Sequence, residues 1–304
     1  MDTGIRDLIK AGVQFGHRTS RWNPKMAPYI LKKRNLIHLI DLKETLRGLI
    51  TGAKLISIIA ERGEYVLFAG TKRAAQSIVR KNAKRCGMPY VADRWPGGLL
   101  TNYVTIRSRL ERLIELEHLE ESGEIENFSK KMISSLRRER RKIERNLGGV
   151  RDMDRLPGAL VIVDPVREYI AADEAIKLDI PSVALVDTNG DPDAVDVVVP
   201  GNDDAIGAIN IFVKTMADAV LEGRKRAEGG EIVEEETEEE EEQEPVRVSS
   251  EEEGEPEAEA EETAEAESED EEPAEDELAE PAVATADNPQ EEESEGAEPE
   301  TEEE

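Results

Sequence analysis

Four short apolar runs, each followed by a turn, constrain the fold of this chain most strongly. The runs occupy residues 65–69, 159–163, 182–186 and 194–199. Helical patterns then occupy residues 73–85, 170–178 and 204–221. Apolar strands that alternate with helices are typical of a parallel sheet that is buried on both faces. The sequence therefore predicts an α/β fold: a Rossmann- or flavodoxin-like, doubly wound, mostly parallel sheet.

Two stretches depart from this alternation. Residues 28–42 have the pattern of a β-hairpin, with strands at 29–31 and 36–40 and a turn at 32–35. Residues 105–147 contain two apolar stripes at helical spacing, and the turn between them is expected at 121–127. The stripes are Ile106, Leu110, Leu113 and Leu116 in the first arm, and Phe128, Met132, Leu136, Ile143 and Leu147 in the second. This pattern predicts an inserted helical coiled-coil hairpin with an acidic first arm and a basic second arm.

Charge is distributed very unevenly along the chain. The whole sequence has 39 basic and 70 acidic residues, for a net charge of −31, which by itself argues against a partner that is a nucleic acid. Residues 231–304, however, hold 38 of the acidic residues and one basic residue, whereas residues 1–150 hold 30 basic and 16 acidic residues. The basic part of the chain is therefore suited to a polyanionic partner.

The acidic segment sets the predicted domain organisation. It consists mostly of Glu, Ala, Pro and Ser, and such a composition buries too little apolar surface to offset the entropy of folding. We expect one α/β domain at 1–230 and a disordered acidic C-terminal tail at 231–304. The tail is interpreted as a solubilising extension, and the alternative is that it shields the basic half before assembly with a partner.

Several classes of protein are disfavoured by simple features. The single cysteine, Cys86, rules out an internal disulfide and a zinc site built from several cysteines. No apolar run approaches the ~20 residues that span a bilayer. The first residues lack the pattern of a secretion signal. We expect a cytoplasmic protein without a membrane partner.

Signals for catalysis are weak. Gly70 follows a strand, but its surroundings match neither the dinucleotide fingerprint nor the Walker motif. Aspartates at strand ends could hold Mg²⁺, although turn and helix-cap roles are favoured at such positions. These aspartates are Asp164, Asp187, Asp191, Asp193, Asp203 and Asp204. His17, His38 and His118 belong to no visible metal motif or nucleophilic triad, so no catalytic residue, cofactor, metal or small-molecule substrate is predicted.

Two segments, 14–34 and 94–109, interleave basic residues with aromatic and amide side chains. Arginine and lysine neutralise phosphates, and aromatic rings stack on unpaired bases, so this mixture favours RNA. The alternative is that Phe15, Trp22, Tyr29 and Trp95 only pack the core.

Ordered motifs along about 225 residues give a more specific indication. They include AGVQFGH at 11–17, WNPKM at 22–26, RWPGGLLTN at 94–102, DTNGDP at 187–192 and PGNDD at 200–204. In these motifs the chain resembles the family of bacterial small-subunit ribosomal protein two. The resemblance implies a Rossmann- or flavodoxin-like domain with a coiled-coil insertion. It also implies a structural, non-enzymatic constituent of the small ribosomal subunit that binds rRNA near the head–body junction. There it would help to recruit the large mRNA-binding ribosomal protein.

On this basis we expect contacts to rRNA backbone from residues 17–34, 72–73 and 94–109 and from the basic helical arm. The candidate rRNA-binding residues are His17, Arg18, Arg21, Trp22, Lys25, Lys32, Lys33, Arg34, Lys72, Arg73, Arg94, Asn102, Arg107 and Arg109. Two alternatives stay open: a nucleotide- or metal-binding Rossmann-like enzyme that uses the strand-end aspartates, and a coiled-coil scaffold that binds protein alone.

Overall fold

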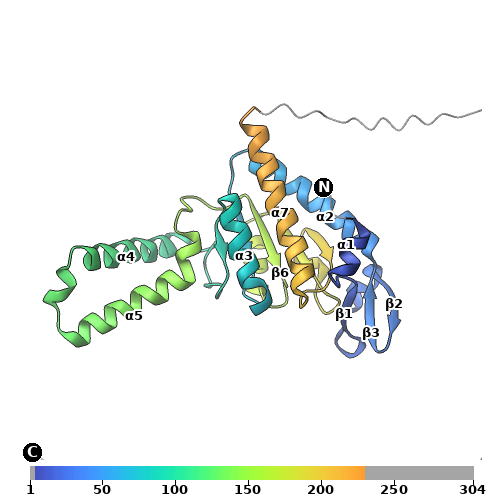
Figure 1. Ribbon diagram of the computed structural model, residues 1–304, viewed down its shortest axis with the longest axis horizontal. Helices are drawn as coiled ribbons and strands as arrows, with labels where there is room; N and C mark the ends of the chain where they lie inside the picture. Colours follow the sequence, from blue (N-terminus) through green and yellow to red (C-terminus); the bar gives the residue numbers. More distant parts are fainter. Residues whose placement is uncertain (1–3, 230–304) are drawn as a thin grey trace, which may run out of the picture. The chain divides into compact units, whose positions relative to one another are not determined.

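The computed structural model describes residues 4–229, in which a five-stranded parallel sheet forms the centre (Figure 1). Its strand order is β5-β4-β6-β7-β8, the order of a flavodoxin-like doubly wound sheet. The strands are β4 (Val66–Ala69), β5 (Tyr90–Val91), β6 (Ala159–Val163), β7 (Ser182–Val186) and β8 (Val197–Pro200). The predicted α/β class is confirmed. The acidic tail predicted at 231–304 lies outside the described residues, and the division of the chain at residue 230 stays a prediction.

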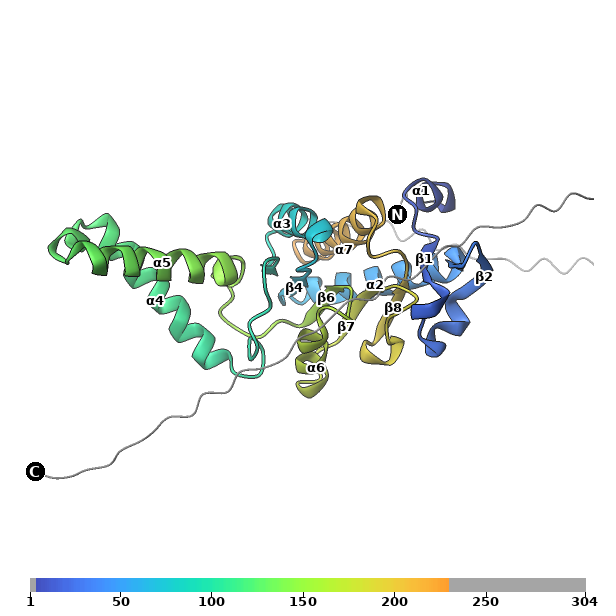
Figure 2. The same cartoon turned by 90° about the horizontal axis from the view of Figure 1, so that it is seen from below.

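Helices cover both faces of this sheet. Figure 2 shows α3 and α7 on one side and α6 on the other. Val66 and Phe68 pack with α2, α3 and α7, whereas the alternate residues Leu67 and Ala69 pack with α6 and with the α4–α5 region. This alternation explains why every residue of β4 is buried. The helices are α2 (Leu42–Glu61), α3 (Arg73–Cys86), α6 (Tyr169–Lys177) and α7 (Ile206–Ala227).

Some elements were not predicted from the sequence. They include the two-residue edge strand β5, the strand β1 (Phe15–Arg18), the helix α2 and the short α1 (Ile5–Lys10). The fourth predicted strand, 194–199, begins only at Val197, because Asp191 caps a 3₁₀ turn, η5 (Pro192–Ala194), ahead of it. No helix in residues 4–229 is long and apolar enough to cross a membrane.

A second, antiparallel sheet has the order β1-β3-β2. It consists of β1 (Phe15–Arg18), β2 (Ile30–Arg34) and β3 (Ile37–Ile40), with η1 (Thr19–Arg21) and η2 (Pro24–Tyr29) between the first two strands. The predicted β-hairpin is confirmed, but the turn predicted at 32–35 is wrong. Arg34 pairs with Ile37, so the turn consists of Asn35 and Leu36, and Lys32, Lys33 and Arg34 lie in a strand.

The inserted helices are α4 (Tyr103–Glu121) and α5 (Lys130–Leu147), joined by η3 (Glu124–Asn127) and followed by η4 (Gly148–Val150). The first apolar stripe is buried as predicted, and so are Leu136, Ile143 and Leu147 of the second. Phe128 and Met132 instead remain 43% and 46% exposed, because Ile125 of η3 is the residue that is buried at the turn between the helices. Arg137 and Arg140 each lie 3.2 Å from Glu120, so charges do pair between the two arms.

Candidate functional site

An exposed basic surface covers the β2–β3 hairpin and the adjoining η1 segment. Its cations are Arg18, Arg21, Lys32, Lys33 and Arg34, and its large uncharged side chains are Trp22, Leu31 and Leu36. We call these eight residues the β-hairpin surface. Among residues 4–229, none of the five cations lies within ion-pair distance of an acidic group. Their charge is therefore available to an anionic partner.

Trp22 is held on this surface by a histidine beneath it. The rings of Trp22 and His38 lie 5.1 Å apart between centroids, and Trp22 keeps 38% of its surface exposed. Burial lowers the pKa of His38, and the nearby charge of Lys33 lowers it further, so the neutral imidazole is favoured. His38 thus lies among apolar neighbours on a strand, as predicted. Its ring packs against Trp22, whose indole stays partly exposed to solvent.

The predicted aromatic residues separate into two roles. Trp95 is buried, which confirms the core-packing interpretation for that residue, whereas Phe15 and Trp22 are 49% and 38% exposed. The residues able to stack on a base are therefore Phe15 and Trp22, on the side of the molecule that carries the β-hairpin surface.

A second group of candidates lies where the chain enters α4. Arg94, Asn102, Arg107 and Arg109 are exposed there, and we call them the α4 surface. Figures 1 and 2 show α4 and the β1–β3 sheet on opposite sides of the five-stranded sheet, so the two surfaces do not merge into one patch. Arg73 is exposed at the start of α3.

The loop beneath the α4 surface is organised by Glu174, a buried residue of α6. Its carboxylate accepts hydrogen bonds from the backbone N–H groups of Gly98, Leu100 and Thr101, at 2.7, 2.8 and 3.0 Å. The indole of Trp95 and the hydroxyl of Thr101 donate two more, both at 3.2 Å. The sequence interpretation missed Glu174, although its position beside Ala171 and Ala175 on the apolar face of α6 is a signal of a buried acid.

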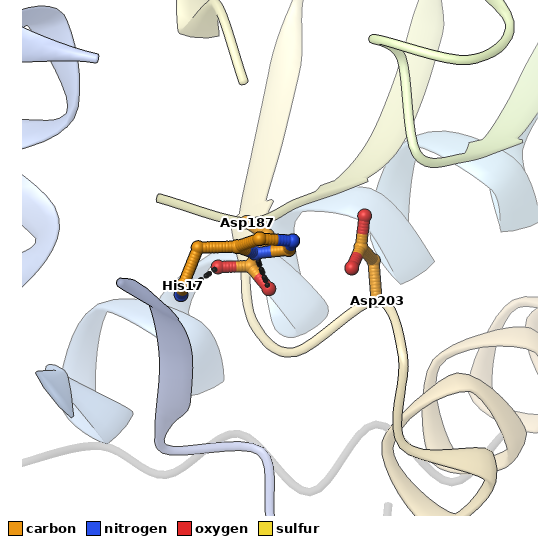
Figure 3. Close-up of side chains that lie close together, drawn as sticks. All are labelled: His17, Asp187 and Asp203. Carbon is orange, nitrogen blue, oxygen red and sulfur yellow. Dashed lines mark hydrogen bonds and ion pairs between the residues drawn. The ribbon is translucent and has the colours of Figure 1, made fainter. Parts of the chain in front are cut away.

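Three of the predicted rRNA-binding residues pair with carboxylates: His17 and Lys72 at the carboxyl ends of the parallel strands, and Lys25 beside them. We call His17, Lys72, Asp164, Asp187, Asp203 and Asp204 the strand-end cluster. His17 Nδ1 lies 2.9 Å from Asp187 Oδ2, and the His17 backbone N–H donates a hydrogen bond to Asp187 (Figure 3). The same N–H also donates to Thr188. The hydrogen bond to Asp187 raises the pKa of His17. These bonds join β1 to the end of β7.

Lys72 is the central cation of this cluster. Its Nζ lies 2.8 Å from Asp203, 2.6 Å from Asp204 and 3.6 Å from Asp164. Burial would lower the pKa of Lys72, but the ion pairs outweigh it and raise that pKa. Burial, together with repulsion from Asp164 and Asp187, raises the pKa of Asp203 to about 7. Lys25 is also ion-paired, but it lies at the surface: its Nζ is 2.8 Å from both Asp191 and Asp193.

The cluster occupies the place where an open α/β sheet usually binds a ligand, at the reversal of strand order between β4 and β6. Glu168 lies next to the cluster. Its carboxylate accepts a hydrogen bond of 2.7 Å from the Thr71 N–H, just before α3. Potential metal-ligand atoms of His17, Asp187 and Asp203 lie within 4.8 Å of one another, but Lys72 already contacts Asp203. Asp164 and Asp191 accept turn N–H groups, as expected of cap residues.

Replacing Gly16 by alanine should detach β1 from the cluster. A Cβ at this position would lie 2.5 Å from Thr188 Cγ2 and 3.1 Å from Asp187 Oδ1, so the strand has to move. We expect a loss of about 1–3 kcal/mol in the free energy of unfolding, the usual cost of overpacking. Urea denaturation measures it, with Gly97→Ala as the control because a Cβ there meets nothing within 4 Å. Equal stabilities of the two variants would refute the close packing.

Replacing Lys72 by methionine should leave several carboxylates without their counter-charge. We expect a loss of about 3 kcal/mol in the free energy of unfolding at pH 8, as for a broken buried ion pair. The loss should shrink at pH 5.5, because Asp203, with its raised pKa, is then protonated and repels Asp164 and Asp187 less. Lys25→Met removes a similar but exposed pair and should cost far less. A loss independent of pH would contradict this electrostatic role.

Comparison with known proteins agrees with the motifs in the sequence. The family model described as Ribosomal protein S2 matches residues 8–223. The chain is 52% identical over 224 residues to "Small ribosomal subunit protein uS2" of Rhodopirellula baltica, covering 74% of this chain and 86% of the relative. It is 51% identical over 224 residues to the protein of the same name from Syntrophobacter fumaroxidans, covering 74% and 82%.

Proposed function

The chain belongs to the ribosomal protein S2 family and is thus a structural component of the small subunit of the cytoplasmic bacterial ribosome; we propose that its β-hairpin surface binds the rRNA there. The observation that carries this proposal is the set of five exposed, unpaired cations around Trp22, Leu31 and Leu36 in the described part of the chain. Cations attract phosphates, and exposed rings and apolar side chains contact bases.

The α4 surface supplies a second rRNA contact in this proposal. Glu174 fixes the loop that carries Arg94 and Asn102, so these side chains start from an ordered backbone. The exposed face of α5 adds cations without an acidic partner among the described residues: Arg138, Arg141, Lys142 and Arg145. Two separate basic surfaces suit an RNA that folds around the protein and is recognised by shape and charge.

His17, Lys25 and Lys72 have an indirect role in this proposal. Each is held by carboxylates of the α/β domain instead of neutralising a phosphate. His17 and Lys25 thereby fix the position of the β1–β3 sheet, and Lys72 joins the strand ends beside it. This assignment differs from the direct contact expected from the sequence alone. It is supported by the distances of 2.8–2.9 Å to Asp187, Asp191 and Asp203.

Recruitment of the large mRNA-binding ribosomal protein is a further part of the proposal, supported by the family resemblance. The proposal contains no catalytic step. An enzyme that uses the strand-end aspartates would take up ATP or Mg²⁺ specifically in equilibrium dialysis, and we expect no such uptake of ATP because Glu168 and the ion pairs of Lys72 occupy the usual phosphate position.

Co-sedimentation tests the proposed function. Small ribosomal subunits depleted of this protein should bind the full chain stoichiometrically at moderate salt, and the amount bound should fall as salt rises. A protein scaffold would bind subunits weakly and without that salt dependence. Failure of the full chain to sediment with depleted subunits would overturn the proposal.

A further inference from the structure

The turn of the β2–β3 hairpin has a backbone that its sequence does not favour. Arg34 pairs with Ile37, which leaves a two-residue turn, and both turn residues have positive φ: 49° at Asn35 and 59° at Leu36. Two-residue turns of this kind prefer Asn followed by Gly, since a β-carbon crowds the left-handed conformation. Asn35 fits this preference, whereas Leu36 stands where glycine would be favoured.

The surrounding contacts hold this unfavourable conformation in place. The Leu36 carbonyl accepts a hydrogen bond from the Thr19 N–H at 3.0 Å, which ties the turn to η1. The side chain itself gains nothing from the fold, because 68% of its surface is exposed. A strained residue with an exposed apolar side chain suggests a role in binding, since folding alone would favour glycine.

The chemistry around Leu36 indicates what it contacts. Leu31, 62% exposed, lies on the same hairpin, and the cations nearest in sequence are Lys32, Lys33 and Arg34. Arg18 pairs with Ile37 across β1 and β3, so it lies beside the turn as well. An apolar tip with cations close to it on the same hairpin and on β1 complements an RNA whose phosphates surround an accessible base, whereas an apolar pocket on a protein would not require these cations.

We propose that Leu36 packs as an apolar wedge against an unstacked base of small-subunit rRNA, with the cations of the β-hairpin surface on the flanking phosphates. This inference rests on the proposed function, because it names one contact within that interface. It predicts that glycine at position 36 gives the more stable fold, whereas leucine gives the tighter binding to rRNA.

Two substitutions, Leu36→Gly and Leu36→Asn, test the wedge in the full-length protein. Both relieve the strained φ, so both should raise the urea midpoint of unfolding. Both should also weaken binding to transcribed small-subunit rRNA, by about tenfold in a filter assay, while the slope against salt stays unchanged because no cation is lost. In addition, one base that the wild-type protein protects from chemical modification should become reactive. Ile176→Ala, which truncates an apolar side chain 55% exposed on α6, serves as the matched control and should leave rRNA binding unchanged.

The outcomes separate the wedge from the proposed function. Wild-type binding to rRNA together with unchanged affinity of both Leu36 variants would overturn the wedge and leave the β-hairpin surface as the proposed interface. Loss of subunit incorporation without loss of rRNA affinity would also overturn it, in favour of a pocket on a neighbouring protein. Absence of wild-type binding to rRNA would overturn the proposed function itself.

Discussion

A variant in which Arg18, Arg21 and Lys32 are replaced by glutamate should fold normally and fail to enter the small ribosomal subunit. The three side chains are exposed and, among residues 4–229, lie near no acidic group. Their reversal therefore removes no ion pair among residues 4–229. It replaces three positive charges by three negative ones opposite rRNA phosphates, a change of six charge units. Lys25 is left out of the variant because it pairs with Asp191 and Asp193 and its loss would disturb the fold of that region.

The expected size follows from counterion release. Three lost phosphate contacts should reduce the slope of log affinity against log salt by about 2–3, and the affinity for rRNA at moderate salt should fall about 100-fold or more. Filter binding over a series of salt concentrations measures both quantities, and sedimentation of reconstituted subunits measures incorporation. Circular dichroism and urea denaturation check that the fold is retained.

A control with the same net charge makes this result specific. Lys54, Lys177 and Lys214 are exposed on α2, α6 and α7, away from the β-hairpin surface. The variant with glutamate at all three positions should bind rRNA much more strongly than the first variant. Equal losses in the two variants would show that overall charge, and not the β-hairpin surface, determines binding.

Replacing Glu174 by alanine should have the largest effect on stability. The carboxylate accepts five hydrogen bonds, so its removal leaves buried N–H donors of the 95–101 loop without partners. We expect a loss of about 3–5 kcal/mol in the free energy of unfolding, measured by urea denaturation. Glu174→Gln should lose less, because its amide oxygen still accepts some of these bonds.

The pH dependence gives an independent check on Glu174. Burial alone would raise its pKa, but the hydrogen bonds from the loop outweigh burial and hold the pKa below its usual value of 4.5. The stabilisation is thus present above pH 4.5 and is lost as the pH falls through the pKa of the folded protein. The alanine variant should lack this contribution, so the two proteins should differ less in stability at pH 3 than at pH 7. An equal difference at both pH values would contradict the role of the carboxylate.

The consequence for binding distinguishes Glu174 from an ordinary core residue. Once the 95–101 loop is released, Arg94 and Asn102 lose their fixed backbone, and rRNA affinity should fall even under conditions in which the variant stays folded. Ile143→Val, a conservative truncation in the α4–α5 core, is a suitable control. Unchanged rRNA binding by folded Glu174→Ala would remove the α4 surface from the proposed interface.

Much of the α/β fold could be predicted because its signal is local. The strands 65–69, 159–163 and 182–186 are short apolar runs that end in turns, and the structure confirms them with shifts of at most one residue. The edge strand β5 could not be found, because two residues carry no periodicity. The β-hairpin turn was misplaced since Lys32–Arg34 look like turn residues, while the actual turn includes a leucine at positive φ.

The candidate site was harder to predict, because pairing is a property of the folded chain. The sequence shows Lys72 and Asp203 separated by more than a hundred residues, and only the meeting of strand ends brings them to 2.8 Å. Lysines that look alike in the sequence therefore differ in the structure: Lys25 and Lys72 pair with carboxylates, whereas Lys32 and Lys33 have no acidic partner within residues 4–229. Glu174 could have been suspected from its place on an apolar helix face, but its five donors come from a distant loop.

Cleavage of rRNA by a tethered probe tests the central claim most directly. Cys86 is buried, so a cysteine introduced at exposed Ser20 in η1 can be labelled selectively with iron–EDTA. The same label at Asp173, exposed on α6, is the comparison. In reconstituted small subunits, hydroxyl radicals from position 20 should cut a confined set of rRNA nucleotides, and the label at position 173 should cut that set weakly or not at all. Absence of rRNA cleavage from position 20 in subunits that contain the labelled protein would contradict binding through the β-hairpin surface.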